Sequence, residues 1–175
     1  EIIRILTEMA DFIRPHIDEM LISYDLLGQI DFIRAKALFA QELDCNMPVL
    51  EQKPQIEWYH AIHPALFLSL REHNKQVVPL DITLDGNDRI LLISGPNAGG
   101  KSVCLKTVGA VQYMIQCGML PPMHANSHIG VFKSIFIDIG DEQSLENDLS
   151  TYSSHITNMK YFLQKADNAT IVLID

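Results

Sequence analysis

A glycine-rich loop followed directly by a lysine and a serine is the part of the sequence best suited to chemistry. The segment LLISGPNAGGKSVCLK, Leu91–Lys106, places Gly95, Gly100, Lys101 and Ser102 in the spacing G-x-x-x-x-G-K-[ST]. Glycines let consecutive N–H groups turn toward an anion without Cβ clashes, and the positive end of a following helix points at the same place. The spacing predicts a loop that binds the phosphates of a nucleoside triphosphate, with Lys101 at the β- and γ-phosphates and the Ser102 hydroxyl on Mg²⁺.

The residues around this loop favour a phosphate site over a chance match of the pattern. An apolar run precedes the loop and an amphipathic pattern follows it, which is the strand–loop–helix context that such a site requires. The residues expected to contact the nucleotide are Gly95, Pro96, Asn97, Ala98, Gly99, Gly100, Lys101, Ser102 and Val103.

An apolar run that ends in an acid supplies the expected second half of a nucleotide site. TIVLID, Thr170–Asp175, predicts a buried strand with Asp175 at its carboxyl end, where the carboxylate would hold Mg²⁺ through water. Taken alone this pattern is common, but paired with the loop it predicts a metal ligand. The general base for water attack often follows this acid directly. The chain begins at Glu1 within a helical pattern and stops at the acid, so we expect a piece of a larger protein that lacks the base.

The composition describes an acidic, ordered globular chain. Its 175 residues are 47% hydrophobic, enough for one substantial core, and 22 acidic against 13 basic residues give a formal net charge of −9. This negative charge repels a polyphosphate backbone, so the main nucleic-acid binding site is not expected within this chain. No apolar run of about 18 residues exists, so no membrane span is expected. Three cysteines without CxxC spacing predict reduced, mostly buried thiols of a cytoplasmic protein.

The first part of the chain, residues 1–54, has the periodicity of helices. Apolar residues recur at three- and four-residue steps up to Leu27, which predicts a long helix that Pro15 bends. Gly28 is expected to separate this helix from a second one, Ile30–Leu43. The apolar stripe predicts helix-on-helix packing, and residues 1–54 are therefore assigned to a helical core segment.

The second part, residues 55–175, alternates strand and helix patterns after an irregular stretch, Cys45–Lys53. DGND, Asp85–Asp88, is expected to form a tight hairpin turn, and Gly118 is the expected C-cap of the helix after the loop. The alternation predicts an α/β fold with a largely parallel sheet. The predicted strands are Val77–Leu84, Ile90–Ser94, Ser134–Ile139 and Thr170–Ile174, and the predicted helices are Lys101–Cys117 and Ser150–Ala166.

The loop and several further stretches, in order along the chain, resemble the MutS family of DNA-repair ATPases. GPNAGGKSV is similar to the family's GPNxGGKS, and its Ala98–Gly99 version followed by Val103 resembles the second, Smr-nuclease-bearing branch. The other similar stretches are IDFIRAKALFA (Ile30–Ala40), AIHPAL (Ala61–Leu66), VVPLDITL (Val77–Leu84) and DIGDEQSLENDLSTYSSHI (Asp138–Ile156).

The resemblance implies an ABC-type P-loop ATPase head, with residues 55–175 forming the first part of that domain up to the Walker B Asp175. In this class two heads form a homodimer that sandwiches each nucleotide between one head's loop and the other's signature helix. Ser150 and Thr151 would belong to that signature, although a role as caps of their own helix is the alternative. Gln143 would approach Mg²⁺ and the attacking water, and would share the catalytic role with Lys101.

The same resemblance implies DNA as a partner, or ribosomes in some lineages, through regions outside this chain, in recombination restraint and repair. The chain departs from the family at Val77, where mismatch-sensing relatives place an aromatic residue on adenine, and in LSTYSS, which lacks the glycine of many ABC proteins.

Two other classes of function are compatible with the same phosphate-binding loop. A small-molecule kinase needs arginines over the phosphates, and no arginine follows Lys106. A nucleotide-responsive dimerisation module without turnover is the second alternative, and it is the reading we favour for this stretch of chain by itself. The histidine pairs His60/His63 and His124/His128 predict packing or turn roles rather than a zinc site. His155 is expected to have a surface or interface role.

Overall fold

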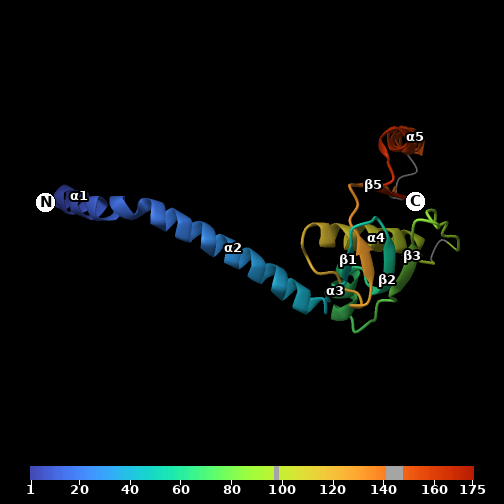
Figure 1. Cartoon of the computed structure of the whole chain (residues 1–175), viewed down its shortest axis with the longest axis horizontal. Coiled ribbons are helices and arrows are strands. Elements are labelled where there is room, and N and C mark those ends of the chain that lie inside the picture. Colours follow the sequence, from blue (N-terminus) through green and yellow to red (C-terminus); the bar gives the residue numbers. More distant parts are fainter. Residues whose placement is uncertain (97–98, 141–147) are drawn as a thin grey trace. The chain divides into compact units, whose positions relative to one another are not determined.

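The structure, a computed structural model, describes residues 1–96, 99–140 and 148–175. The chain divides into two compact units, Glu1–Phe39 and Ala40–Asp175. Figure 1 labels the elements of both. This division lies before the predicted boundary at residue 54, and the assignment of residues 1–54 and 55–175 to two domains stays a prediction.

The first unit is helical. It contains α1 (Ile2–Ile13), the 3₁₀ turn η1 (Arg14–His16) and most of α2 (Ile17–Glu42). Pro15 lies in η1, so the predicted bend is confirmed. The predicted break at Gly28 is wrong, because α2 runs through it for 26 residues. A helix-interior glycine costs about 1 kcal/mol relative to alanine, which is too little to end a helix of this length.

The apolar stripe of these helices is exposed in the part of the chain that the structure describes. No residue of α1 is buried, and Ala40 is the single buried residue of α2. The expected helix-on-helix packing is therefore not formed by the residues that the structure describes.

The second unit contains a mixed four-stranded sheet in the order β1-β4-β2-β3. β1 and β4 are parallel, whereas β2 pairs antiparallel with both β4 and β3. The largely parallel sheet predicted from the alternation of elements is wrong here, because strands joined through a helix can still pair antiparallel. The elements are β1 (Val49–Glu51), β2 (Ile56–Ala61), α3 (Pro64–Glu72), β3 (Leu80–Leu84) and β4 (His128–Gly130).

The predicted strand Ile90–Ser94 is wrong. The Asp85–Asp88 turn forms, with the Asp85 carboxylate accepting the N–H groups of Asn87 and Asp88, but no strand follows it. The side chains of Ile90 and Leu92 are 91% and 87% exposed. A short apolar run forms a strand only if it can pair with the edge of a sheet. The periodicity of the sequence does not indicate whether such an edge is available.

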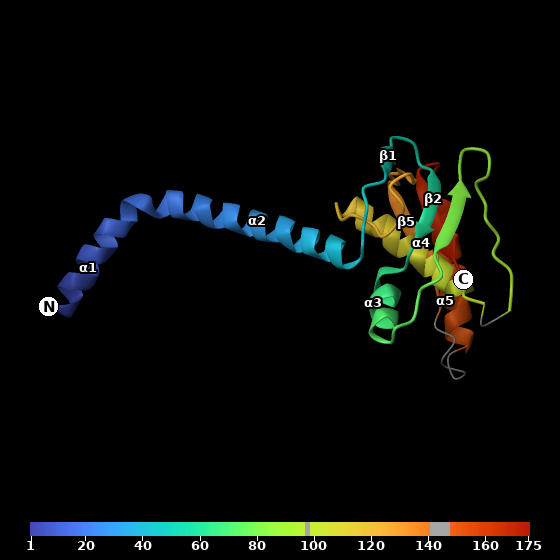
Figure 2. The same ribbon diagram turned by 90° about the horizontal axis from the view of Figure 1, so that it is seen from below.

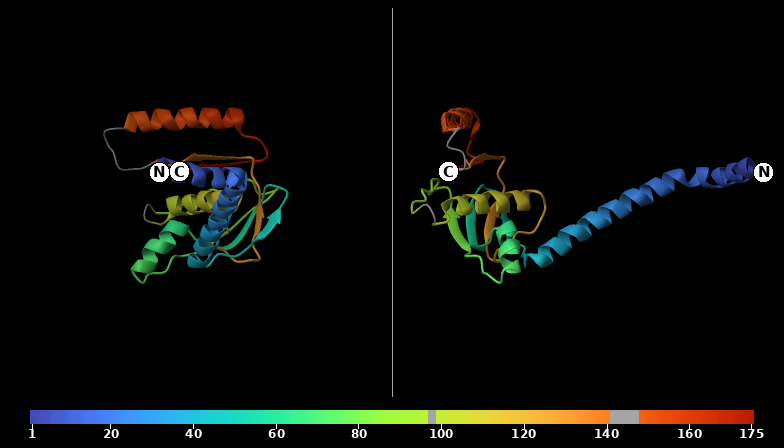
Figure 3. Two further views of the ribbon diagram at one scale, coloured as in Figure 1. Left: turned by 90° about the vertical axis from the view of Figure 1, so that its left-hand side faces the viewer. Right: turned by 180° about the vertical axis from the view of Figure 1, so that it is seen from behind.

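A second sheet pairs β5 (Ser134–Asp138) with β6 (Thr170–Ile174) in parallel, with Asp138 opposite Ile174. Both strands lie where they were predicted, although β5 ends at Asp138 rather than Ile139. The expectation that β6 is a buried strand holds for one face only, because Val172 and Ile174 are exposed. The helix α5 (Asp148–Lys165) connects them, close to the predicted Ser150–Ala166. Figures 1 and 3 show α5 and α4 (Lys101–Gln116) on opposite sides of these strands.

The side chains of β5 and β6 alternate between those two helices, as expected for strands. Phe136 of β5 stacks on Phe162 of α5 with ring centroids 5.2 Å apart. On the other face, Leu173 of β6 lies so close to Gly109 of α4 that a Cβ on Gly109 would be 3.2 Å from its Cδ1. The sheet is therefore held from both sides.

Helix α4 links the two sheets through one hydrophobic core. Val108 and Val111 belong to the same buried cluster as Trp58 of β2 and Leu173 of β6. As predicted, Gly118 caps the carboxyl end of the helix, and its φ of 68° is the left-handed conformation of such a cap. The N–H of Met119 donates to the carbonyl of Met114 and that of Gly118 to Ile115, which is a Schellman cap.

The three cysteines are more exposed than predicted. Cys45 and Cys104 are half-buried and Cys117 is exposed, so the expectation of mostly buried thiols is wrong. Partial burial raises the pKa of Cys104, and burial together with the Asp44 charge raises that of Cys45 to about 11. Among the described residues no helix has the length and apolar character to cross a membrane.

Candidate phosphate-binding site

The glycine loop leads directly into α4. Gly100 occupies the N-cap position with a φ of 84°, a left-handed conformation that favours glycine. The Gly99 N–H donates to the Pro96 carbonyl at 2.9 Å, and a Cβ on Gly99 would lie 3.0 Å from that oxygen. The N–H groups in the first turn of a helix have no intrahelical acceptor, so they present donors and a positive dipole end to an anion. The start of α4 thus has the local geometry of an anion site.

The Lys101 side chain folds back over the loop. Its Nζ donates to the carbonyl oxygens of Gly95 at 2.9 Å and Pro96 at 3.0 Å. These neutral acceptors hold the amine near the mouth of the loop. Phosphate oxygens are stronger acceptors for an ammonium group than these neutral carbonyls are.

The other predicted loop residues are placed in part. Ser102 lies in the first turn of α4, and the adjacent Val103 is exposed. Asn97, Ala98 and Gln143 lie outside the described residues. Their predicted contacts stay predictions.

Asp175 directly follows β6, as predicted. Its N–H donates to the carbonyl of Asp138, the last residue of β5, at 3.0 Å. Figures 1 and 2 agree that the carboxyl end of β6 lies near the amino end of α4. The carboxyl ends of parallel strands are the usual ligand edge of an α/β sheet. The fold therefore brings the two predicted halves of the site to the same edge.

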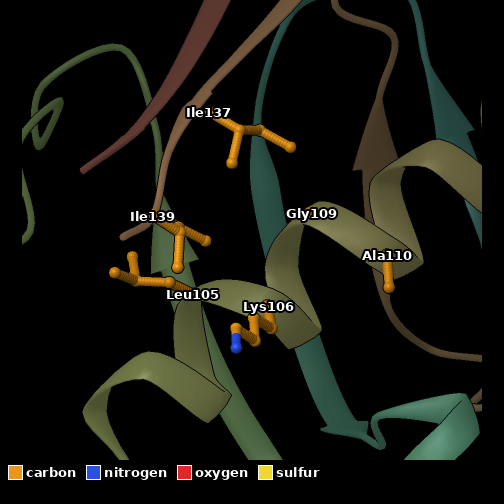
Figure 4. Close-up of a pocket in the computed structure, with 6 residues that line it drawn as sticks. All are labelled: Leu105, Lys106, Gly109, Ala110, Ile137 and Ile139. Carbon is orange, nitrogen blue, oxygen red and sulfur yellow. The ribbon is translucent and has the colours of Figure 1, made fainter. Parts of the chain in front are cut away.

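A pocket of about 360 Å³ lies between the early turns of α4 and the end of β5. Figure 4 shows the apolar side chains of Leu105, Ile137 and Ile139 around it, with the Lys106 amine at its margin. Gly109 and Ala110 complete the lining. The pocket is apolar and is adjacent to the loop helix, so it is a packing gap beside the site rather than part of the phosphate cradle.

Ser150 and Thr151 lie in the first turn of α5. The helix begins at Asp148, so neither residue occupies the N-cap position that the alternative interpretation assigned to them. The backbone N–H of Ser150 is instead among those that a helix leaves without an internal acceptor, and Thr151 is the next residue along. This placement fits an anion-facing helix end.

A polar cluster around Asp138 was not predicted. Asp138 is 6% exposed, and its Oδ2 lies 2.7 Å from His155 Nδ1 while its Oδ1 accepts from Asn158 Nδ2 at 2.9 Å. Burial raises the pKa of the carboxyl, but the hydrogen bonds from His155 and Asn158 and the histidine charge outweigh it, leaving the pKa below its usual value. The ionised carboxylate can only accept, so Nδ1 of His155 carries the proton.

The sequence did contain a signal for this cluster. His155 and Asn158 precede the buried Phe162 by seven and four residues, which places two polar side chains on the packed face of α5. Polar residues on such a face require a buried partner.

Comparison with known proteins agrees with these features. Residues 91–175 match the family model of MutS domain V. The chain is 40% identical over 172 residues to a protein named Endonuclease MutS2 from Lactiplantibacillus plantarum, covering 98% of this chain and 21% of that protein. Proteins with the same name from Geobacillus sp. and Finegoldia magna are 41% and 42% identical over 175 residues, covering all of this chain and 22% of each. The chain thus spans about a fifth of the length of the relatives it matches.

Proposed function

Because this chain belongs to the MutS family, and resembles its second branch as predicted, we propose that it is the ATP-binding part of a MutS-type ATPase head. The observation that carries the proposal is the start of α4. A left-handed glycine opens the helix, and the next residue, Lys101, holds its amine over the loop carbonyls. These features support a P-loop as the proposed site, in which triphosphate oxygens would replace those carbonyls.

The donor set suits magnesium. Mg²⁺ prefers oxygen ligands, keeps several waters and is bound in most nucleotide sites through one or two protein groups and the phosphates. Ser102 offers a hydroxyl in the first turn of α4 and Asp175 a carboxylate at the end of β6. When bound, the metal neutralises charge on the phosphates.

The remaining residues have roles that extend the same proposal. Lys101 stabilises charge on the terminal phosphates, and Gln143 orients the attacking water. The amino end of α5, with Ser150 and Thr151, faces the γ-phosphate of a second protomer in a homodimer. Binding would close the dimer and hydrolysis would open it.

DNA is the proposed substrate of the whole protein, in recombination restraint or repair, with ribosomes as the partner in some lineages. The net charge of −9 argues that this part does not itself hold DNA. The DNA contacts would come from other regions of the longer protein, to which the ATPase head transmits its nucleotide state.

Replacement of Lys101 by alanine tests the proposal in the full-length protein. A charge-assisted contact to phosphate contributes on the order of 1.5–3 kcal/mol, so ATP should bind at least about tenfold more weakly. Lys106→Ala is the matched control, since it removes an exposed lysine from the same helix and should leave the affinity within about twofold. Equal ATP affinity of Lys101→Ala and the wild type would rule out the phosphate-binding role.

Turnover is measured separately, by single-turnover hydrolysis of radiolabelled ATP in the full-length protein. Wild-type hydrolysis that Lys101→Ala abolishes supports an ATPase. Tight ATP binding with ATP-dependent dimerisation and no hydrolysis would favour the dimerisation module instead.

A further inference from the structure

Asp138 connects three elements through one residue. Its carbonyl accepts the N–H of Asp175, and its two carboxylate oxygens accept from His155 and Asn158 of α5. Asp138 therefore touches both the strand end that carries the proposed metal ligand and the helix whose first turn contains Ser150 and Thr151.

The two side-chain contacts fix α5 in more than one direction. His155 and Asn158 are three residues apart, which is nearly one helical turn, and they bind the two oxygens of one carboxylate. A helix held at two such points can neither slide along its axis nor rotate about it without breaking a hydrogen bond. Thr151 is four residues before His155, or about 6 Å along the axis, so this attachment sets the position of the first turn.

Packing of the rest of α5 is of a different kind. Phe136 contacts Tyr161 and Phe162 near the carboxyl end of the helix, with ring centroids 5.5 and 5.2 Å apart. Apolar contacts are non-directional and tolerate small shifts. A buried carboxylate with hydrogen-bonded partners contributes little net stability relative to apolar packing, so its value lies in geometry.

We propose that Asp138 is a positioning residue that holds the first turn of α5 in a fixed place relative to Asp175. The inference rests on the proposed function, in which that turn and Asp175 act on nucleotide phosphates. Asp138 then sets the distance between Asp175, the proposed metal ligand of one site, and the first turn of α5, which is proposed to contact the nucleotide of the second protomer. The Asp138 carboxylate itself does not contact the nucleotide.

The test uses His155 variants of the full-length protein. His155→Ala removes the donor to Asp138, whereas His155→Asn keeps an N–H donor close to the position of Nδ1. Since Lys101 and the loop are untouched, ATP affinity measured at protein concentrations too low for dimerisation should stay within about twofold in both. We expect kcat to fall about tenfold in His155→Ala and to recover to within about threefold of wild type in His155→Asn, with a parallel loss and recovery of ATP-dependent dimerisation.

Two further variants complete the design. Asn158→Ala removes the second contact and should lower kcat in the same direction. Glu51→Gln is the matched control, because Glu51 also lies 2.8 Å from a histidine, His128, but in the other sheet, and it should not change kcat. Thermal unfolding and circular dichroism verify that each variant folds.

The outcomes separate the two proposals. If ATP binding depends on Lys101 while His155→Ala and Asn158→Ala keep wild-type kcat, the positioning role of Asp138 is refuted and the ATPase proposal stands. Failure of His155→Asn to rescue a defective His155→Ala also counts against the role. If ATP binding does not depend on Lys101, the proposed function fails and this inference fails with it.

Discussion

His63 shows how a single side chain combines structural and titratable roles. Its Nδ1 accepts the Leu66 N–H at 3.2 Å and caps α3, ahead of Pro64 in the first helical turn. Burial lowers the pKa of the ring, and the nearby charge of Lys106 lowers it further. A protonated Nδ1 could not accept this bond. The turn role that we expected for His63 is therefore found, as a helix cap.

Acid should weaken this cap. The folded pKa of His63 lies below its usual value of 6.5, so the stabilisation is fully present above that pH and is lost as the pH falls through the lowered pKa. Asparagine caps helices without titrating in this range. We expect the drop in melting temperature from about pH 7.5 to about pH 5.5 to be smaller in His63→Asn than in wild type. An equal drop in both proteins would show that His63 does not contribute to the acid sensitivity.

The remaining histidines of the two predicted pairs also have ordinary partners. His60 stacks on His124 with ring centroids 4.6 Å apart, and His128 contacts Glu51. In the parts of the chain that the structure covers, no three histidine, cysteine or acidic side chains come together as a metal site. The expectation of packing roles agrees with these contacts.

At the scale of elements, close approach between backbones decides how β4 fits against residues 53–55, which precede β2. Gly130 ends β4, where its N–H donates to the Gln55 carbonyl and its own carbonyl accepts from buried Gln112 of α4. A Cβ on Gly130 would overlap the Lys53 carbonyl and the Gln55 N–H group. The strand therefore requires a residue without a side chain at this point.

Gly130→Ala should lower the free energy of unfolding by about 3 kcal/mol, since the neighbours are backbone atoms that cannot move aside. Gly86→Ala is the control, because a Cβ there meets no atom within 4 Å. Chemical denaturation of the two variants gives the comparison. Equal stabilities would show that the backbone around Gly130 yields more easily than its contacts indicate.

At the scale of the molecule, the two units differ in how they are stabilised. The second unit has a core that joins both sheets through α4. None of the described side chains in Glu1–Phe39 is buried, and its helices expose large apolar residues such as Ile3 and Phe12. Exposed helices with few packed side chains open at low free-energy cost.

Limited trypsin digestion of the 175-residue chain should therefore begin in the first unit. We expect early cleavage at Arg34, whereas Lys106, which is also exposed but lies on the packed helix α4, should resist. Mass spectrometry of timed samples identifies the order. Simultaneous cleavage at Arg34 and Lys106 would contradict a difference in local stability.

The sequence by itself determined the local features of this protein. Each of these features follows from a pattern within one segment of the chain. They are the spacing from Gly95 to Ser102, the start of α4 at Lys101, the Gly118 cap, the strands β5 and β6, and the helix between those strands. Such patterns depend on backbone preferences and side-chain periodicity, which neighbouring residues specify. The family resemblance came from the same local motifs.

The tertiary structure decided the features that depend on a partner distant in the chain. Three features depend on which surfaces meet in the folded chain. They are the absence of Ile90–Ser94 from the sheets, the antiparallel pairing of β2 and the exposure of the apolar stripe of α1. The contact of Asp138 with His155 and Asn158 is of the same kind, since it forms only when α5 packs on β5. Sequence periodicity states which face of an element is apolar, but pairing energies between distant segments select its neighbour.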